Sequence, residues 1–99
     1  MSTVTHTLAE SIQAHNEEVK ELTLRRPTVQ ECRAIKALPY NIGESGYPIL
    51  DVEVAAKYIA VCAAIPASSV NQLALPDLNN VAWLIVGFFM PRDSEQSAA

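Results

Sequence analysis

The spacing of apolar residues changes at Pro27-Thr28, and this change divides the chain into two kinds of structure. Before it, Val4, His6 and Leu8 alternate with threonines, which is the two-residue period of a strand with one buried face. After it, apolar residues recur every three or four positions, as they do on the buried side of a helix. This order predicts an α+β fold in which an N-terminal β-hairpin is followed by a small bundle of three to four helices.

The hairpin is expected at about residues 3–25, with strands at about 3–12 and 17–25. Asn16 lies in the polar stretch between them and tolerates the positive φ that a tight turn requires. Residues 8–14 are also compatible with a helix, so the form of the connection stays open. Because an isolated hairpin is only marginally stable in water, it must pack on the helices or pair with another chain.

The first helix is expected at about 28–38, because Thr28-Val29-Gln30-Glu31 has the sequence of a capping box. Prolines and glycines in residues 39–49 predict a loop. Further helices are expected at about 51–65, 68–73 and 76–90. The helix at 51–65 carries two apolar stripes and is expected to be central.

The chain length predicts one domain over residues 1–91. Residues 92–99 have nothing to bury and are expected to be a disordered tail.

The charge pattern argues against nucleic acid as a partner. The net charge is −4 and the only adjacent basic pair is Arg25-Arg26, whereas phosphate binding requires a basic cluster. The longest apolar run, residues 81–90, is about half of what a membrane span needs, so we expect no membrane segment. The first residues show no signal peptide, and we expect a soluble cytoplasmic protein.

No group of residues has the spacing of a catalytic or cofactor site. His6, His15, Cys32 and Cys62 include no pair at the short spacing of zinc ligands, and no glycine-rich phosphate loop or nucleophile elbow occurs. Both cysteines are expected to be reduced thiols in the core, and His6 a packed side chain. We therefore predict no enzyme activity, no cofactor and no metal. A zinc site assembled only by folding and a Cys–His nucleophile at Cys32 are the alternatives.

The last helix has apolar residues on more than one side. Its core face is expected to hold Leu78, Val81, Ala82, Ile85, Phe88 and Phe89. A second face, offset by about a third of a turn, holds Asn79, Trp83, Val86 and Met90. Since Trp and Met are favoured at interfaces, these four residues are the predicted partner-binding surface. The alternative is extra packing beneath the hairpin or the 39–49 segment.

Three motifs, in this order, resemble the phage tail assembly chaperone family of Mu-like and related contractile-tailed phages. The first is Lys20-Glu21-Leu22-Thr23-Leu24-Arg25-Arg26-Pro27-Thr28, which ends the hairpin and opens a helix. The second is Ser69-Val70-Asn71-Gln72-Leu73, and the third runs from Asp77 through Val81 to Phe88-Phe89. The resemblance covers about residues 4–90, and the proline- and glycine-bearing segment 39–49 departs from it.

The resemblance implies a non-enzymatic chaperone that binds the tape-measure protein and keeps it soluble in the host cytoplasm during tail tube assembly. The tail tube protein is a second candidate partner. The family also implies a longer frameshifted product, for which residues 92–99 would be the point of attachment. Two other functions stay open, namely a self-assembling structural subunit, which would form a homo-oligomer through the hairpin edge, and a small regulatory adaptor.

Overall fold

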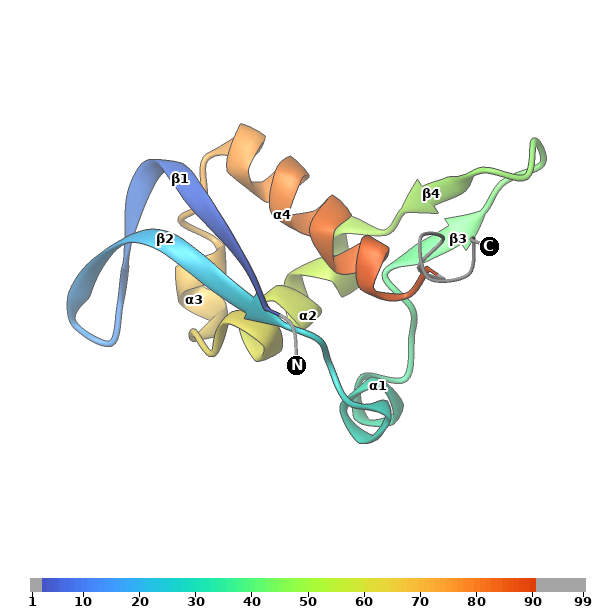
Figure 1. The fold of residues 1–99 in the computed structure, drawn as a ribbon, viewed down its shortest axis with the longest axis horizontal. Helices are drawn as coiled ribbons and strands as arrows, with labels where there is room; N and C mark the ends of the chain where they lie inside the picture. Colours follow the sequence, from blue (N-terminus) through green and yellow to red (C-terminus); the bar gives the residue numbers. More distant parts are fainter. Residues whose placement is uncertain (1–2, 91–99) are drawn as a thin grey trace.

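A computed structural model describes residues 3–90 as two β-hairpins and four helices (Figure 1). The elements are β1 (Thr3–Ala14), β2 (Glu17–Arg25), α1 (Val29–Ile35), β3 (Tyr40–Ile42), β4 (Pro48–Leu50), α2 (Val52–Ala63), α3 (Ala67–Val70) and α4 (Leu75–Phe88). The predicted α+β class, with an N-terminal hairpin followed by helices, is confirmed. The predicted tail at 92–99 lies outside the described residues, and the domain boundary at 91 stays a prediction.

The first hairpin is an antiparallel pair of β1 and β2 joined by a two-residue turn. His15 and Asn16 have φ values of 54° and 64°, the left-handed conformation that type I′ hairpin turns require at both positions. Residues 8–14 therefore form strand rather than helix, and β1 extends two residues beyond the expected end at 12. The outer face is polar, where the hydroxyls of Thr5 and Thr23 lie 3.4 Å apart across the strands.

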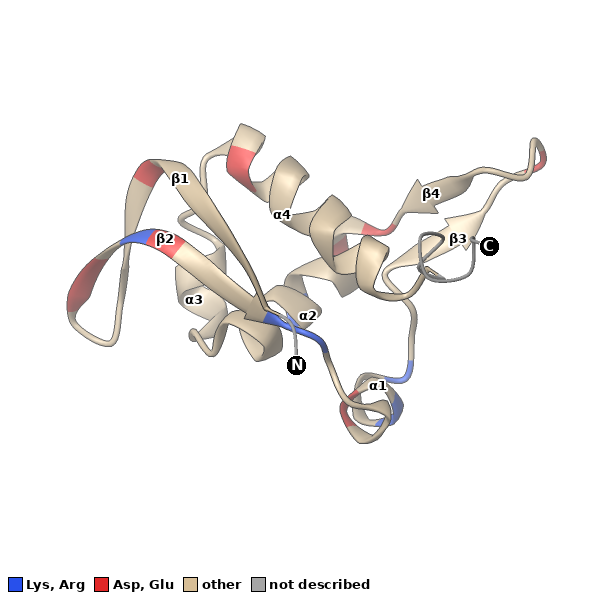
Figure 2. Cartoon of the chain, viewed as in Figure 1, with Lys and Arg blue, Asp and Glu red and all other residues tan. Residues whose placement is uncertain are grey.

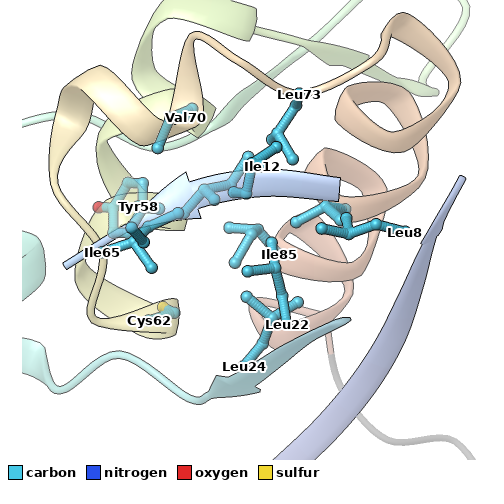
Figure 3. Close-up of a cluster of buried hydrophobic side chains, with 13 residues drawn as sticks. Leu8, Ile12, Leu22, Leu24, Tyr58, Cys62, Ile65, Val70, Leu73 and Ile85 are labelled. Carbon is cyan, nitrogen blue, oxygen red and sulfur yellow. The ribbon is translucent and has the colours of Figure 1, made fainter. Parts of the chain in front are cut away.

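The inner face of this hairpin covers the helices and forms the core with them. Figure 3 shows side chains of β1 and β2 meeting those of α2 and α4. The largest fully buried side chains of the cluster are Ile12, Leu24, Tyr58, Ile59, Val81 and Ile85. Helix α2 packs against β2, α1, α3 and α4, so the expected central position of this helix is confirmed.

A register shift between Thr7 and Ile12 interrupts the pairing of β1 with β2. Asp77, in the first turn of α4, takes up the backbone donors of this irregular stretch. Its carboxylate accepts hydrogen bonds from the Ala9 amide at 2.9 and 2.8 Å and from the Glu10 amide at 3.3 Å, and His6 Nε2 donates at 3.1 Å. Asp77 is thus a clamp that fastens the irregular part of β1 to α4.

The second fastening of β1 lies near its end, where Gln13 faces α3 and the segment that follows it. The Gln13 carbonyl accepts from Ser69 Oγ at 2.6 Å and from Gln72 Nε2 at 3.2 Å, and the Gln13 amide donates to Gln72 Oε1 at 2.8 Å. Ser69 is buried, so its hydroxyl needs such a partner. Helix α3 and the residues that follow it therefore hold the tip of the first hairpin to the helices.

The residues between the first hairpin and α1 join three parts of the fold. Arg25 forms a bidentate ion pair with Glu31, at 2.9 and 2.8 Å. The guanidinium of Arg26 donates to the Phe88 carbonyl at 3.1 Å and lies 5.3 Å from the centre of the Phe88 ring. The C-terminal end of α4, where carbonyls lack helical partners, is therefore held by a cation.

The predicted capping box at the start of α1 is confirmed. Thr28 Oγ1 accepts from the Glu31 amide at 3.1 Å, and Glu31 accepts from the Thr28 amide at 2.9 Å. Side-chain hydrogen bonds from Arg25, followed by the bond from Thr28, lower the pKa of Glu31 to about 2. Helix α1 ends before the expected residue 38, because Lys36 adopts the left-handed conformation with φ 71° and terminates it.

The prediction of a loop at residues 39–49 was wrong, because this segment forms the second hairpin. Strands β3 and β4 are antiparallel, with Tyr40 opposite Leu50 and Ile42 opposite Pro48. The turn closes with a hydrogen bond of 3.0 Å from the Gly46 amide to the Gly43 carbonyl, and Gly46 has φ +89°. The glycines that indicated a loop are the residues that make this tight turn possible.

Candidate partner-binding surface

Four residues were candidates for a zinc site or a nucleophile, namely His6, His15, Cys32 and Cys62. Cys32 is half-buried and Cys62 buried, and both are free thiols. Burial raises the pKa of Cys62 to about 11, which disfavours the reactive thiolate. His6 contacts Asp77, and His15 Nε2 donates to the Ala64 carbonyl at 3.0 Å. In the part of the chain that the structure describes, no three His, Cys, Asp or Glu side chains gather as metal ligands would.

A shallow groove of about 270 Å³ lies between α2 and α3. Its walls are Glu53, Ala56, Lys57, Ala67, Val70 and Asn71. Small-molecule sites usually enclose roughly 300 to 1,000 Å³ with converging polar groups. The groove lies at the lower limit of that range, and it gives no support for a small-molecule site.

The four residues of the predicted surface on α4 differ in their exposure. Asn79 is exposed, Trp83 is 41% exposed and Met90 is half-buried, so these three residues reach the surface. Trp83 follows Asn79 by four residues, which places the two side chains on one side of the helix. This side of α4 remains a candidate surface.

Val86 does not belong to that surface, because it is buried with only 2% exposure. It follows the buried Ala82 by four residues and precedes Phe89 by three, so it lies on their side of α4. Helix α4 also contacts β4. The alternative of extra packing near the 39–49 segment therefore describes Val86 better than partner binding does.

Most of the exposed apolar surface lies elsewhere, on the second hairpin and its flanks. We call residues 38–52 the arm. Within residues 3–90, eight large apolar side chains are exposed, and five of them belong to the arm, namely Leu38, Ile42, Tyr47, Ile49 and Val52. The arm projects from the end of the molecule opposite the first hairpin (Figure 1). Sequence reasoning missed this surface because it treated the segment as a loop.

Aromatic contacts hold the base of the arm to the core. The Tyr40 ring meets the Phe89 ring edge-on at 6.3 Å, and Phe89 meets Tyr58 in the same way at 5.3 Å. The Tyr58 hydroxyl donates to the Ala37 carbonyl at 2.6 Å, just before the arm. Burial raises the pKa of Tyr58 above its usual range, so its hydroxyl remains a neutral donor. The base is therefore fixed while the tip extends into solvent.

The outward-facing side chains of the arm follow from its register. Asn41 is opposite Ile49, and the Gly43 amide donates to the Tyr47 carbonyl at 3.0 Å. Because side chains alternate between faces along a strand, Ile49 and Tyr47 share a face. A Cβ atom at Gly43 would lie 2.6 Å from Ile49 Cδ1, so the Ile49 side chain lies across the glycine. Ile49 and Tyr47, which are 57% and 73% exposed, thus form an apolar patch.

Acidic residues border this patch. Glu44 lies in the turn at the tip, and Asp51 and Glu53 lie where the arm meets α2. No Lys or Arg occurs between Ala37 and Ala56. Figure 2 shows Lys and Arg at α1 and along β2, and the basic residues nearest to this stretch in the sequence are Lys36 before it and Lys57 after it. The arm is therefore an apolar surface with an acidic border.

The three motifs of the chain have structural roles. Arg25, Arg26 and Thr28 join the first hairpin to the helices, Ser69 and Gln72 hold Gln13, and Asp77 clamps β1. These residues stabilise the fold, so the binding surface has to be sought among the exposed apolar residues of the arm and α4.

The comparisons agree with this sequence pattern over nearly the whole chain. A family model described as phage tail assembly chaperone proteins, E, or 41 or 14, matches residues 5–90. No curated protein and no solved structure matches the chain. Among the described residues, no helix is both long and apolar enough to cross a bilayer.

Proposed function

The chain belongs to the phage tail assembly chaperone family, and we propose that it binds the tape-measure protein and keeps it soluble in the host cytoplasm while the tail tube assembles. In this role it acts by binding alone, without catalysis. The tail tube protein, which assembles around the tape measure, is a second candidate partner.

The observation that carries this proposal is the exposed apolar surface outside a closed core. Core side chains such as Leu24 and Ile85 are fully buried, yet Ile42 and Tyr47 on the arm and Trp83 on α4 are exposed. Exposed apolar groups that cluster on one part of a small protein are typical of a protein-binding surface. Helical, apolar segments of a tape-measure protein are suitable partners for such a surface.

The acidic character of the chain supports the same role. With a net charge of −4, the chaperone adds charge to any complex that it forms. Net charge away from zero opposes association between complexes and so favours solubility. A chaperone that covers apolar segments and adds like charge therefore delays their aggregation in two ways.

Co-expression with the tape-measure protein of the same phage tests the proposal. We expect the tape-measure protein to move from the insoluble to the soluble fraction and to co-purify with the chain. A tape-measure protein that stays insoluble and does not co-purify contradicts the proposal. Light scattering on the purified chain tests the alternative of a self-assembling subunit, which requires a mass that rises with concentration.

The contribution of the α4 surface is tested by Trp83→Glu. We propose that Asn79, Trp83 and Met90 contact the partner, so this variant should fold normally but retain less tape-measure protein. Val29→Glu is the matched control, because Val29 is 76% exposed and lies on α1, away from both candidate surfaces. Loss of the cooperative thermal transition in Trp83→Glu would instead place Trp83 in the core.

A further inference from the structure

We infer that the arm, residues 38–52, is the docking element and that its occupant is an amphipathic helix of a protein partner, with an apolar stripe bordered by lysine or arginine. The inference rests on the proposed function for the identity of the partner. It adds which part of the chain binds and what chemistry the bound segment has.

Charge complementarity determines the flanks of this helix. The apolar patch of Tyr47 and Ile49 has Glu44 at one end and Asp51 and Glu53 at the other, with no basic residue between Ala37 and Ala56. A helix with acidic flanks would meet like charges at both ends of the patch, whereas a helix with basic flanks would meet opposite charges. The acidic border therefore selects basic segments and rejects acidic ones.

The dimensions of the arm determine the spacing of those basic residues. Four residue steps separate Tyr47 from Asp51, and at about 3.3 Å per step they span about 13 Å. A helix covers that length in roughly nine residues, or a little more than two turns. The fitting segment therefore carries basic residues about two turns apart, on either side of a short apolar stripe.

The short strands favour a helix over an added strand. Strands β3 and β4 have three residues each, so an edge of the arm offers very few backbone groups to an incoming strand. Its exposed outer face consists instead of the large side chains of Tyr47 and Ile49, at 73% and 57% exposure. Side-chain contacts of this kind are the mode by which amphipathic helices bind.

Peptides test the inference without the tape-measure protein. Three labelled peptides of about 18 residues, roughly five helical turns, share one leucine stripe and differ only in flanks of Lys, Gln or Glu. Fluorescence anisotropy measures their binding to the intact chain. We expect the Lys-flanked peptide to bind at least about tenfold more tightly than the Glu-flanked peptide. Equal affinities for the three peptides overturn the inference.

Two variants locate the peptide on the arm. Tyr47→Thr/Ile49→Thr removes both large side chains of the apolar patch and leaves β-branched residues that suit a strand, and should weaken binding of the Lys-flanked peptide about tenfold or more. Val29→Thr, the control on α1, should change it by less than about twofold. An unchanged affinity in the arm variant overturns the assignment.

A charge exchange keeps the assignment testable if the threonine variant disturbs the arm. Glu44→Lys/Glu53→Lys should reverse the preference, so that the Glu-flanked peptide binds better. Glu17→Lys/Glu18→Lys makes the same change of net charge on the first hairpin, where all four residues compared are exposed, and should leave the preference as it is. Equal effects of the two variants would mean that only net charge matters, and the arm assignment would be wrong.

The remaining outcomes separate this inference from the proposed function. Sedimentation of the chain alone tests a second copy as the occupant. A dimer that Tyr47→Thr/Ile49→Thr dissociates contradicts a helical partner on the arm. If the tape-measure protein co-purifies equally with wild type and with both arm variants, the function stands and the docking assignment fails. If it never co-purifies but the Lys-flanked peptide binds the arm, the docking assignment stands and the function fails.

Discussion

The two hairpins of this chain use apolar residues in opposite ways. In the first, β1 and β2 have 12 and 9 residues, and the apolar side chains of their inner face, such as Ile12 and Leu24, are buried against the helices. In the second, β3 and β4 have three residues each, and Ile42 and Ile49 are exposed. The outer face of the first hairpin is polar, whereas the outer face of the second is apolar.

This difference separates stability from recognition. The first hairpin closes the core, and it is fastened by Asp77 at its irregular stretch and by Gln13 near its turn. The second is held at its base, through the contact of Tyr40 with Phe89 and the hydrogen bond from Tyr58 to Ala37. A substitution in the first hairpin should therefore change the free energy of unfolding, whereas one in the second should change binding.

The largest expected effect tests this division directly. Leu24→Ala, at a fully buried position of β2, should lower the free energy of unfolding by about 3 kcal/mol, since it leaves a cavity in the core. Ile49→Ala, in β4, should lower it by less than about 1 kcal/mol. Urea unfolding followed by circular dichroism measures both. Similar losses in the two variants would show that the arm belongs to the core.

The next effect concerns the clamp on the first hairpin. Asp77 is 2% exposed, and Asp77→Asn weakens the hydrogen bonds from Ala9 and Glu10. This variant should lower the free energy of unfolding by about 2 kcal/mol. Asp51→Asn at the end of the arm is the matched control, because Asp and Asn are equally good N-caps, and it should cost little. Equal losses of unfolding free energy in the two variants would show that the Asp77 clamp stabilises the protein no more than a helix cap does.

The clamp also gives the first hairpin a dependence on pH. Burial alone would raise the pKa of Asp77, but hydrogen bonds from Ala9, His6 and Glu10 outweigh it and hold the pKa below its ordinary value of 3.8. The stability from Asp77 is therefore fully present above that value and is lost as the pH falls through the lower, folded-state pKa. Acid unfolding of Asp77→Asn should be less steep than that of the wild type below about pH 4.

A smaller effect is expected at the junction that links the two hairpins. Thr28→Ala removes one half of the capping box at α1 and should lower the free energy of unfolding by about 1 kcal/mol. Thr28→Ser retains the hydroxyl and should cost much less. Thermal unfolding of both variants measures the difference, and equal losses would mean that the methyl group, rather than the hydroxyl, stabilises the junction.

The smallest effects are expected at the two turns. Gly46 has φ +89°, so Gly46→Ala should destabilise the arm locally by about 1 kcal/mol, which hydrogen exchange at Gly43 and Ile49 detects. Asn16→Gly should stabilise the first hairpin by about 0.5 kcal/mol, because glycine adopts the required positive φ without strain. Faster exchange throughout the core of Gly46→Ala would show that the arm does not open independently.

The elements with a long, regular pattern could be predicted from the sequence. The alternation of Val4, His6 and Leu8 extends over enough residues to define a strand, and Thr28 with Glu31 defines the start of α1. The arm could not be predicted in the same way. Its strands have three residues, too few to show a period, and Pro48, the first residue of β4, cannot be told from a loop proline in the sequence.

Helical spacing does not show which elements cover a helix, so it could not predict which of the four residues of the α4 surface are exposed. Spacing placed Asn79 and Trp83 together correctly, but it also grouped Val86 with them, which tertiary packing buries. The hydrogen bonds of Asp77 could not be predicted, because a partner 68 positions away in the sequence leaves no local signal. The apolar residues and glycines of the arm were visible, but they had been read as a loop.

The clamp at Asp77 has a consequence for the order in which the chain matures on the ribosome. Strand β1 is among the first parts to be synthesised, yet the carboxylate that satisfies its Ala9 amide is added 68 residues later. Until then the first hairpin can form only through local contacts, with its irregular stretch still solvated. Closing such a long loop slows folding, so the core is completed only when most of the chain has been made. The arm can fold as soon as it has been synthesised, because its strands and turn are contiguous in the sequence.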